Sequence, residues 1–234
     1  MQNIERGSAA TGSGAEVSFG VEVDECSRAR GRYKAESIGP VEHMRERYVA
    51  LRDRLNSNGV KGFVDRLFNG AKLFKELSAI PMELKWSDVA ENIVTTVGKN
   101  LALDTYLAGS AYTVTGPFMF LINTNASAAV VGDTMASHSG WLEVGNANAP
   151  TYTSPRKTAA WSSASSGSKA LSSALSFAIT SSGSVGGCGL VFGSGAVSTI
   201  DSTAGTLYSA GAFSGGTKTV SNGDTLSVSY TASL

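Results

Sequence analysis

The sequence predicts a mainly β protein, with an antiparallel β-sandwich or jelly-roll-like domain, a helical insertion and a flexible N-terminal arm. From residue 111 onward, about eight short strand-like segments are separated by turn residues, for example at Asn123-Thr124-Asn125 and Asn222-Gly223-Asp224. Charge is unevenly distributed, because residues 22–91 hold 25 charged residues whereas residues 100–234 hold only nine. The two parts are therefore expected to differ in surface and architecture.

The N-terminal part predicts an arm followed by a strand. Residues 1–15 are rich in glycine and serine, a composition that favours a flexible arm because little apolar surface offsets the entropy of ordering. In the following segment, residues 16–26, Val17, Phe19, Val21 and Val23 alternate with mostly polar residues. This alternation predicts a strand of the β domain.

Residues 27–83 predict a helical insertion. After Pro40, which suits the first turn of a helix, Val41, Met44, Tyr48, Leu51 and Leu55 recur at spacings of three and four. A second apolar stretch runs from residue 63 to residue 80. We expect a helical hairpin whose apolar stripes face each other. Because two short helices bury little area, the hairpin should also need to pack against another surface, from the same chain or a neighbour, to be stable.

The β domain is predicted to comprise residues 16–26 and 84–234. The segment LKWSDVAENIVTTV (84–97) favours extended structure, and GKNLALDTYLAGS (98–110) favours a short helix capped by Gly109. In the final TLSVSYTASL, alternate residues from Leu226 to Leu234 are apolar, which predicts a half-buried strand. The candidate strands are residues 111–123, 141–144, 151–163, 169–180, 185–193, 205–213, 218–222 and 225–234.

The overall composition argues against several classes of protein. The 234-residue chain has a formal net charge of zero, whereas a nucleic-acid-binding protein usually carries a basic surplus. It has no apolar run of about eighteen residues that would span a membrane, and its first residues lack the pattern of a secretory signal. We therefore expect synthesis in the cytoplasm, with Cys26 and Cys188 as free buried thiols or, alternatively, as a disulfide.

The sequence shows no convincing catalytic site, metal site or cofactor site, and we expect the protein not to be an enzyme. His43 lies in a charged helix and His138 in a predicted loop, and no metal-ligand spacing accompanies either. His138 precedes Ser139, but a catalytic dyad would also need an orienting carboxylate and an oxyanion hole. Asp133 and Glu143 are a formal pair of acids, which a β domain commonly contains without glycosidase activity.

A local basic segment, RARGRYK, contains Arg28, Arg30 and Arg32 with Tyr33 interleaved. Such a segment can contact a phosphate backbone, pair with an acidic protein surface, or serve as a solvated linker. The nearby acids Asp24 and Glu36 favour the last two interpretations.

Several segments together resemble a family of small virion proteins of tailed bacteriophages. They are LKWSDVAENIVTTVGKNLALDTYLAGSAYTVTGPFMFLINTN, GDTMASHSGWLEV, TYTSPRKTAAW, GTLYSAGAFSGG and NGDTLSVSY. The resemblance covers residues 16–26 and 84–234 and is closest to head decoration, or cement, proteins of podophages. In that family a short turn joins the first two strands, whereas here residues 27–83 are inserted.

The resemblance implies a β-sandwich on the capsid exterior that binds the major capsid protein and stabilises contacts between its subunits. It also implies symmetric contacts between copies of this chain, dimeric or higher, and no direct contact with nucleic acid or membrane. We expect Tyr48, Phe63, Phe68 and Phe74 of the insertion, and the three arginines of RARGRYK, to be partner-contact residues.

The alternative is a tail-fibre or receptor-binding component of the virion. In that case Trp141, Tyr152 and Trp161 would form a glycan-binding face on the β domain.

Overall fold

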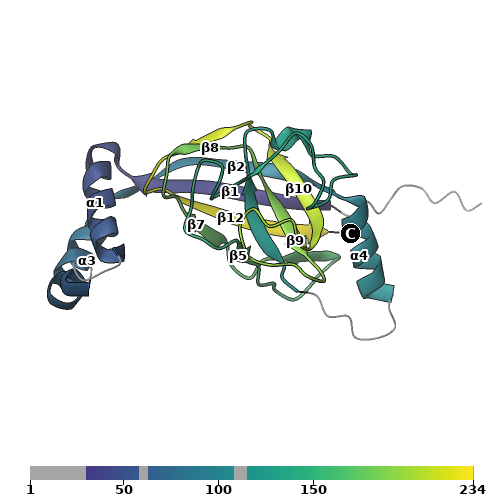
Figure 1. Cartoon of the computed structure of the whole chain (residues 1–234), viewed down its shortest axis with the longest axis horizontal. Helices are drawn as coiled ribbons and strands as arrows, with labels where there is room; N and C mark the ends of the chain where they lie inside the picture. Colours follow the sequence, from purple (N-terminus) through teal and green to yellow (C-terminus); the bar gives the residue numbers. More distant parts are fainter. Residues whose placement is uncertain (1–29, 58–62, 108–114, 234) are drawn as a thin grey trace, which may run out of the picture.

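The structure, a computed structural model, describes residues 30–57, 63–107 and 115–233. A β body occupies the centre, a helical lobe projects from one end and a single helix lies against the other end (Figure 1). The prediction of a mainly β protein with antiparallel sheets and a helical insertion is confirmed. The predicted arm (1–15) and the predicted strand at 16–26 lie outside the described residues.

The strands of the described residues are β1 (Arg30–Pro40), β2 (Met82–Val94), β3 (Phe118–Ile122), β4 (Glu143–Val144), β5 (Lys157–Thr158), β6 (Ser168–Ala170), β7 (Leu175–Ala178), β8 (Gly183–Val185), β9 (Gly187–Phe192), β10 (Thr206–Phe213), β11 (Lys218–Val220) and β12 (Thr225–Ser233). The helices and helical turns are η1 (Glu42–Met44), α1 (Arg45–Asn56), η2 (Asp65–Asn69), α3 (Gly70–Ser78), α4 (Thr96–Leu107) and η3 (Ala126–Ala128). Each candidate strand named from residue 111 onward contains at least part of an observed strand.

One antiparallel sheet contains most of the described strands, in the order β4-β3-β9-β10-β2-β1-β12-β6, with β5 paired to β3 and β7 paired to β12. Strands β8 and β11 form a separate two-stranded sheet. Val144 of β4 and Phe177 of β7, which lie toward opposite ends of this order, belong to the same buried cluster. The sheet therefore curls over itself and encloses a core, as the two layers of a sandwich do.

Strand β3 is buried on both faces, with one hydrophobic cluster on each face. Met119 and Leu121 enter the larger cluster, whereas Phe120 and Ile122 enter a smaller one with Trp141. Successive side chains of a strand point to opposite faces, so the continuous apolar run FMFLI is what such a position requires. The C-terminal strand β12 was predicted correctly, and Leu226, Val228 and Tyr230 face the larger cluster.

The helical insertion begins later than predicted. Residues 30–40, assigned from the sequence to the insertion, form strand β1, which pairs with both β12 and β2. Tyr33, Ala35 and Ser37 are fully buried, and charged or polar residues between them face outward. This is a period of two, characteristic of a strand with one buried face. The helices are inserted between Pro40 and Met82, which are partners at the end of a β ribbon.

Candidate interaction surface

The helical lobe, residues 41–57 and 63–81, has a small core of its own. Leu51 of α1 is buried against Leu73 of α3 and Ile80, and a second layer of partly buried residues completes the cluster. That second layer consists of Met44, Tyr48, Leu55 and Leu77. The predicted hairpin with facing apolar stripes is thus present.

Tyr48 is an internal packing residue of this lobe. It is partly buried in the lobe core, and its ring lies against Gly223 in the turn before β12. The ring thus helps to seat the lobe on the β body, and because Tyr48 is only partly buried, its role as a partner-contact residue stays a prediction.

The other three predicted contact residues of the insertion remain exposed. Phe68 is 75% exposed and Phe74 is 67% exposed, and Phe63 is exposed to a similar degree. Together with two further exposed side chains they form a set that we call the distal apolar patch: Phe63, Val64, Leu67, Phe68 and Phe74. Phe63 and Leu67, and Val64 and Phe68, are four residues apart, so the two members of each pair are neighbours on the surface of this helical segment.

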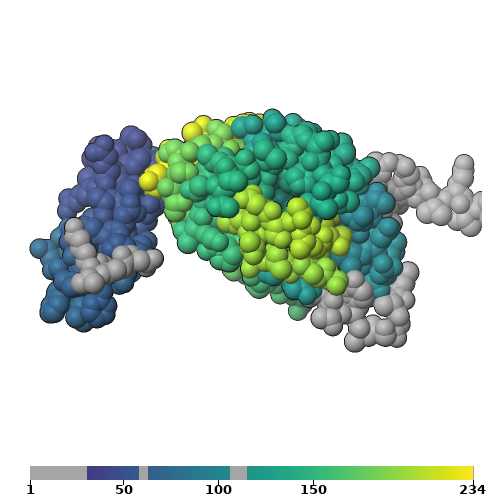
Figure 2. All heavy atoms as spheres, viewed as in Figure 1, coloured from purple at the N-terminus to yellow at the C-terminus, as the bar shows by residue number. Residues whose placement is uncertain are grey.

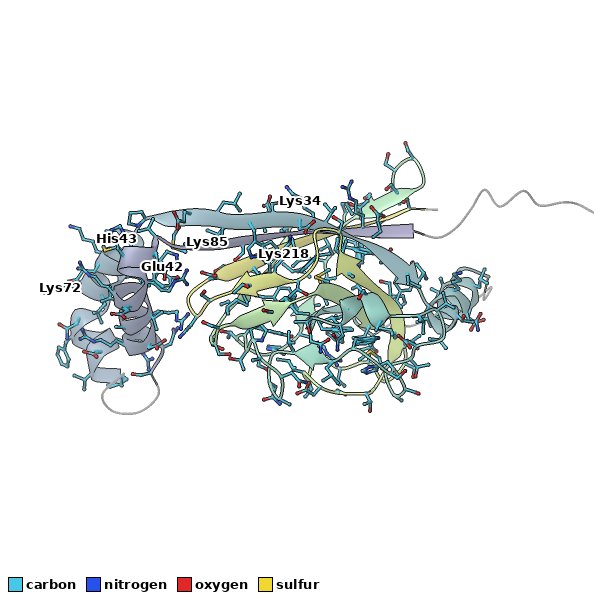
Figure 3. All side chains as sticks on the ribbon, turned by 90° about the horizontal axis from the view of Figure 1, so that it is seen from above. Lys34, Glu42, His43, Lys72, Lys85 and Lys218 are labelled. Atoms are coloured by element: carbon cyan, nitrogen blue, oxygen red, sulfur yellow. The ribbon has the colours of Figure 1, made fainter. Side chains whose placement is uncertain are left out.

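Two arginines of α1 fasten the lobe to the β body. Arg45 Nη1 donates to Asp224 Oδ1 at 2.9 Å and to the Asn222 carbonyl at 3.0 Å. Arg52 donates from Nη1 to the Ile179 carbonyl at 3.1 Å and from Nη2 to Asn222 Oδ1 at 2.8 Å. Figure 3 shows the lobe at the end of the ribbon formed by β1 and β2, beside the turn that these arginines reach. The lobe therefore has a defined orientation.

The basic segment RARGRYK does not build an aromatic and basic surface in its described part. Arg32 is exposed and lies 3.5 Å from Glu91, its partner on β2. Tyr33 points to the opposite face, where it is fully buried and its hydroxyl shares a hydrogen bond of 2.8 Å with Ser209 Oγ. Arg28 lies outside the described residues, and only the backbone of Arg30 is described.

Glu143, Asp133 and His138, which were considered for catalysis, have structural partners. The buried Glu143 accepts hydrogen bonds from Arg156 Nε at 2.9 Å and Nη2 at 2.6 Å. Asp133 accepts from Trp141 Nε1 at 2.8 Å, and His138 stacks on the Trp141 ring with centroids 3.8 Å apart. The His138 Nδ1 lies 3.1 Å from the Trp141 carbonyl, the backbone contact expected of a loop histidine.

The described residues contain no metal-binding cluster of side chains and no helix that could cross a membrane. No three side chains of His, Cys, Asp or Glu within residues 30–57, 63–107 and 115–233 gather closely enough to hold a metal ion. None of the described helices combines the length and hydrophobicity required of a membrane span.

The three aromatic residues considered for glycan binding are not brought together. Trp141 is buried in the smaller cluster and Tyr152 in the larger one, so neither ring is available to a sugar. Trp161 alone is partly exposed, at the edge of a hollow beside α4. Sequence reasoning could not separate these positions, because an aromatic residue in a β domain suits a core or a binding face equally well.

Comparisons with known proteins give no match. No family model, no curated protein and no solved structure matches this chain.

Proposed function

We propose that this chain is a structural protein of a tailed-phage virion that binds the outer surface of the capsid and stabilises contacts between major capsid protein subunits. The phage assignment follows from the resemblance in residues 16–26 and 84–234. The observation that carries the adhesive role is the distal apolar patch, a set of five exposed apolar side chains on the helical lobe, which lies at one end of the molecule (Figure 2).

The patch has the chemistry of a protein-binding surface. Large apolar side chains that remain exposed in a cluster are characteristic of interaction sites. Burying one such side chain fully stabilises a complex by about 1.5–3 kcal/mol, so five of them provide a modest contact once ordering costs are subtracted. A decoration protein needs only modest contacts, because many copies act together on one closed shell.

Charge on the lobe selects the kind of partner surface. Residues 41–57 and 63–81 hold seven basic and five acidic residues, an excess of two positive charges in a chain that is neutral overall. A complementary surface is therefore apolar at its centre and acidic at its rim. We assign this surface to the major capsid protein, with neighbouring copies of this chain in contact through their β bodies.

The test uses purified particles and a triple variant, Phe63→Ser/Phe68→Ser/Phe74→Ser. The matched control is Val130→Ser/Val131→Ser/Leu142→Ser, which removes three exposed apolar side chains from the β body. The lobe variant is expected to fold normally, to be depleted from particles, and to lower the temperature at which they release DNA. The control is expected to leave occupancy unchanged.

Two outcomes would overturn the proposal. Equal occupancy of wild type and lobe variant would remove the patch from the interface. Cryo-EM density for the chain at the tail vertex alone would support the receptor-binding alternative instead of decoration.

A further inference from the structure

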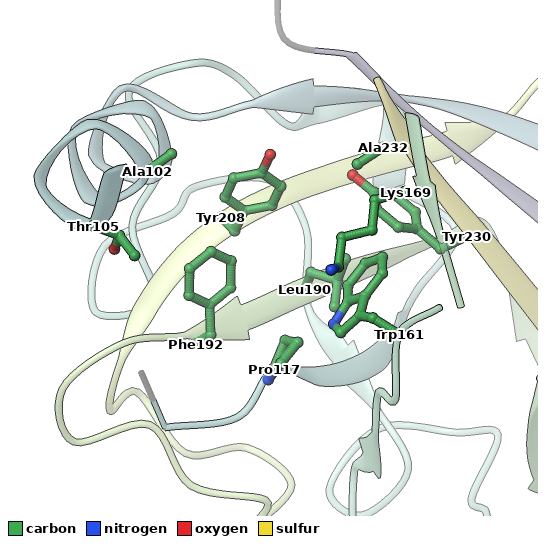
Figure 4. A pocket seen from close by; sticks show the side chains of 10 residues that line it. All are labelled: Ala102, Thr105, Pro117, Trp161, Lys169, Leu190, Phe192, Tyr208, Tyr230 and Ala232. Atoms are coloured by element: carbon green, nitrogen blue, oxygen red, sulfur yellow. The ribbon is translucent and has the colours of Figure 1, made fainter. Parts of the chain in front are cut away.

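A hollow of about 550 Å³ opens between α4 and the β body, far from the helical lobe (Figures 1 and 4). Its volume lies in the range of roughly 300–1,000 Å³ that is typical of small-molecule sites. We call it the aromatic hollow. It is lined by Ala102, Thr105, Pro117, Trp161, Lys169, Leu190, Phe192, Tyr208, Tyr230 and Ala232.

Its aromatic walls are held in place by packing. Phe192 of β9 and Tyr208 of β10 have ring centroids 4.9 Å apart, and Trp161 meets Tyr230 of β12 edge-on at 5.7 Å. Rings fixed by neighbours lose little freedom when a ligand binds, which favours affinity.

The helical wall is also anchored. The Thr95 backbone N–H donates to the Tyr208 carbonyl at 3.0 Å, and the Thr95 hydroxyl accepts from the Gly98 N–H at 3.0 Å at the start of α4. A Cβ at Gly98 would collide with the backbone of Tyr208, so this glycine allows α4 to lie directly on β10. The hollow is consequently a preformed feature of the fold.

Two polar groups of the aromatic hollow are donors, the exposed Lys169 ammonium and the half-buried Trp161 indole N–H, and the hydroxyls of Thr105, Tyr208 and Tyr230 also line it. The Lys169 ammonium and the Trp161 indole N–H have no hydrogen-bond or ion-pair partner within the described part of the chain. Figure 4 shows the Lys169 side chain running beside Trp161, with its amine directed into the hollow. No carboxylate or amide side chain is among the lining residues.

This combination excludes some ligand classes and favours one. A sugar would bury many hydroxyl groups against a mainly apolar wall whose side-chain acceptors are only the hydroxyls of Thr105, Tyr208 and Tyr230, and each unpaired group costs about 1–3 kcal/mol. A cationic ligand would meet the Lys169 ammonium. An apolar molecule with one carboxylate matches both the walls and the unpaired donors.

We propose that the aromatic hollow binds a small amphiphilic carboxylate, with its aliphatic or aromatic body between Trp161, Phe192 and Tyr208 and its carboxylate on Lys169. The hollow shares no residue with the distal apolar patch. A test of ligand binding here is therefore separate from a test of capsid binding.

Isothermal titration calorimetry of the full chain tests this assignment with decanoate, used below its micelle concentration, and with decanol. Decanoate is expected to bind one site with a dissociation constant of roughly 10–1,000 µM, judged from its twelve non-hydrogen atoms. Lys169→Met keeps an apolar stem and removes the charge. It is expected to weaken decanoate binding about tenfold and to leave decanol binding unchanged.

A second pair of variants tests the location. Ala102→Trp fills the hollow from the exposed face of α4 and is expected to abolish binding, whereas Leu103→Trp, one residue along the same helix and outside the lining, is expected to preserve it. Absence of saturable binding, equal affinity in Lys169→Met, or equal loss in both tryptophan variants would overturn the proposal.

Discussion

Replacing Arg45 with methionine should weaken the attachment of the helical lobe to the β body, leaving the hydrogen bonds of Arg52 in place. The Arg45 side chain is only 15% exposed, and its guanidinium bonds to Asp224, whose side chain is 2% exposed. The substitution keeps an apolar stem and removes the guanidinium. Asp224 Oδ2 retains the Ser221 N–H at 2.9 Å, whereas Oδ1 loses the arginine. The Asn222 carbonyl loses the same donor.

The size of the effect follows from these contacts. A hydrogen bond to a charged group contributes about 1.5–3 kcal/mol, and a buried charge stripped of its partner costs about 3–5 kcal/mol. Because Arg45 is partly exposed, water can replace some of its donors, so we expect a loss of about 2–3 kcal/mol. For a chain of this size, that loss lowers the melting temperature by roughly 4–12 °C.

Calorimetry and amide hydrogen exchange measure the two parts of this prediction. Arg45→Met should lower the melting temperature and speed exchange in α1 and α3 more than in the β body. Arg47→Met is the matched control, since this arginine of the same helix is 58% exposed and lies 3.6 Å from Glu76. An exposed pair contributes at most about 1 kcal/mol.

The reasoning fails if Arg45→Met and Arg47→Met melt within about 1 °C of each other, by the same scale of degrees per kcal/mol. A further check is the double variant Arg45→Met/Asp224→Asn. Asp224→Asn removes the carboxylate charge and with it the free-energy cost of leaving that buried charge unpaired. The double variant should therefore lose less stability than the sum of the losses in the two single variants.

Three further predictions concern the β body. Arg156→Met leaves the buried Glu143 carboxylate without its ion-pair partner, so it should lower the free energy of unfolding by about 3–5 kcal/mol. Urea titration measures this change, and a decrease below about 1 kcal/mol would contradict the expected role of the ion pair. Burial raises the pKa of Asp88, but hydrogen bonds from Lys218, the Val89 N–H and the turn after β10 outweigh burial and lower the pKa to about 2. The ionised form therefore stabilises the fold above about pH 4, and this contribution is lost as pH falls toward 2, so the stability gap between wild type and Asp88→Asn should narrow between pH 7 and pH 2. Burial raises the pKa of the Cys188 thiol, so this thiol should react with Ellman's reagent only at the rate of global unfolding, and rapid labelling of the folded Cys188 would disprove its burial.

Local periodicity was enough to predict the elements that bury one face. In β12, Leu226 and Val228 alternate with serine, and the structure buries both side chains completely. In η1 and α1, Met44, Tyr48 and Leu51 recur at helical spacing and pack in one cluster with Leu73 of α3. Such patterns predict secondary structure because each helix or strand must bury its own apolar side chains, whichever surface it packs against.

Strand β1 shows where local patterns mislead. Its outward positions hold Arg32, Lys34 and Glu36, and two of its inward positions hold Ala35 and Ser37 rather than large apolar residues. Without large apolar residues at these inward positions, the alternation does not predict a strand, and the sequence assigns these residues to the helical insertion. Pairing with β2 and β12 on both sides supplies the burial that these small residues need.

By itself, the sequence determined a β domain rich in short strands, a helical hairpin with apolar stripes and a terminal half-buried strand, because those properties depend on the order of neighbouring residues. Only the tertiary structure decided that Phe68 stays exposed while Trp141 is buried, because burial depends on which distant surface covers a side chain. Likewise, Lys169 and Phe192 meet at one hollow only because the sheet curls and α4 lies across its end.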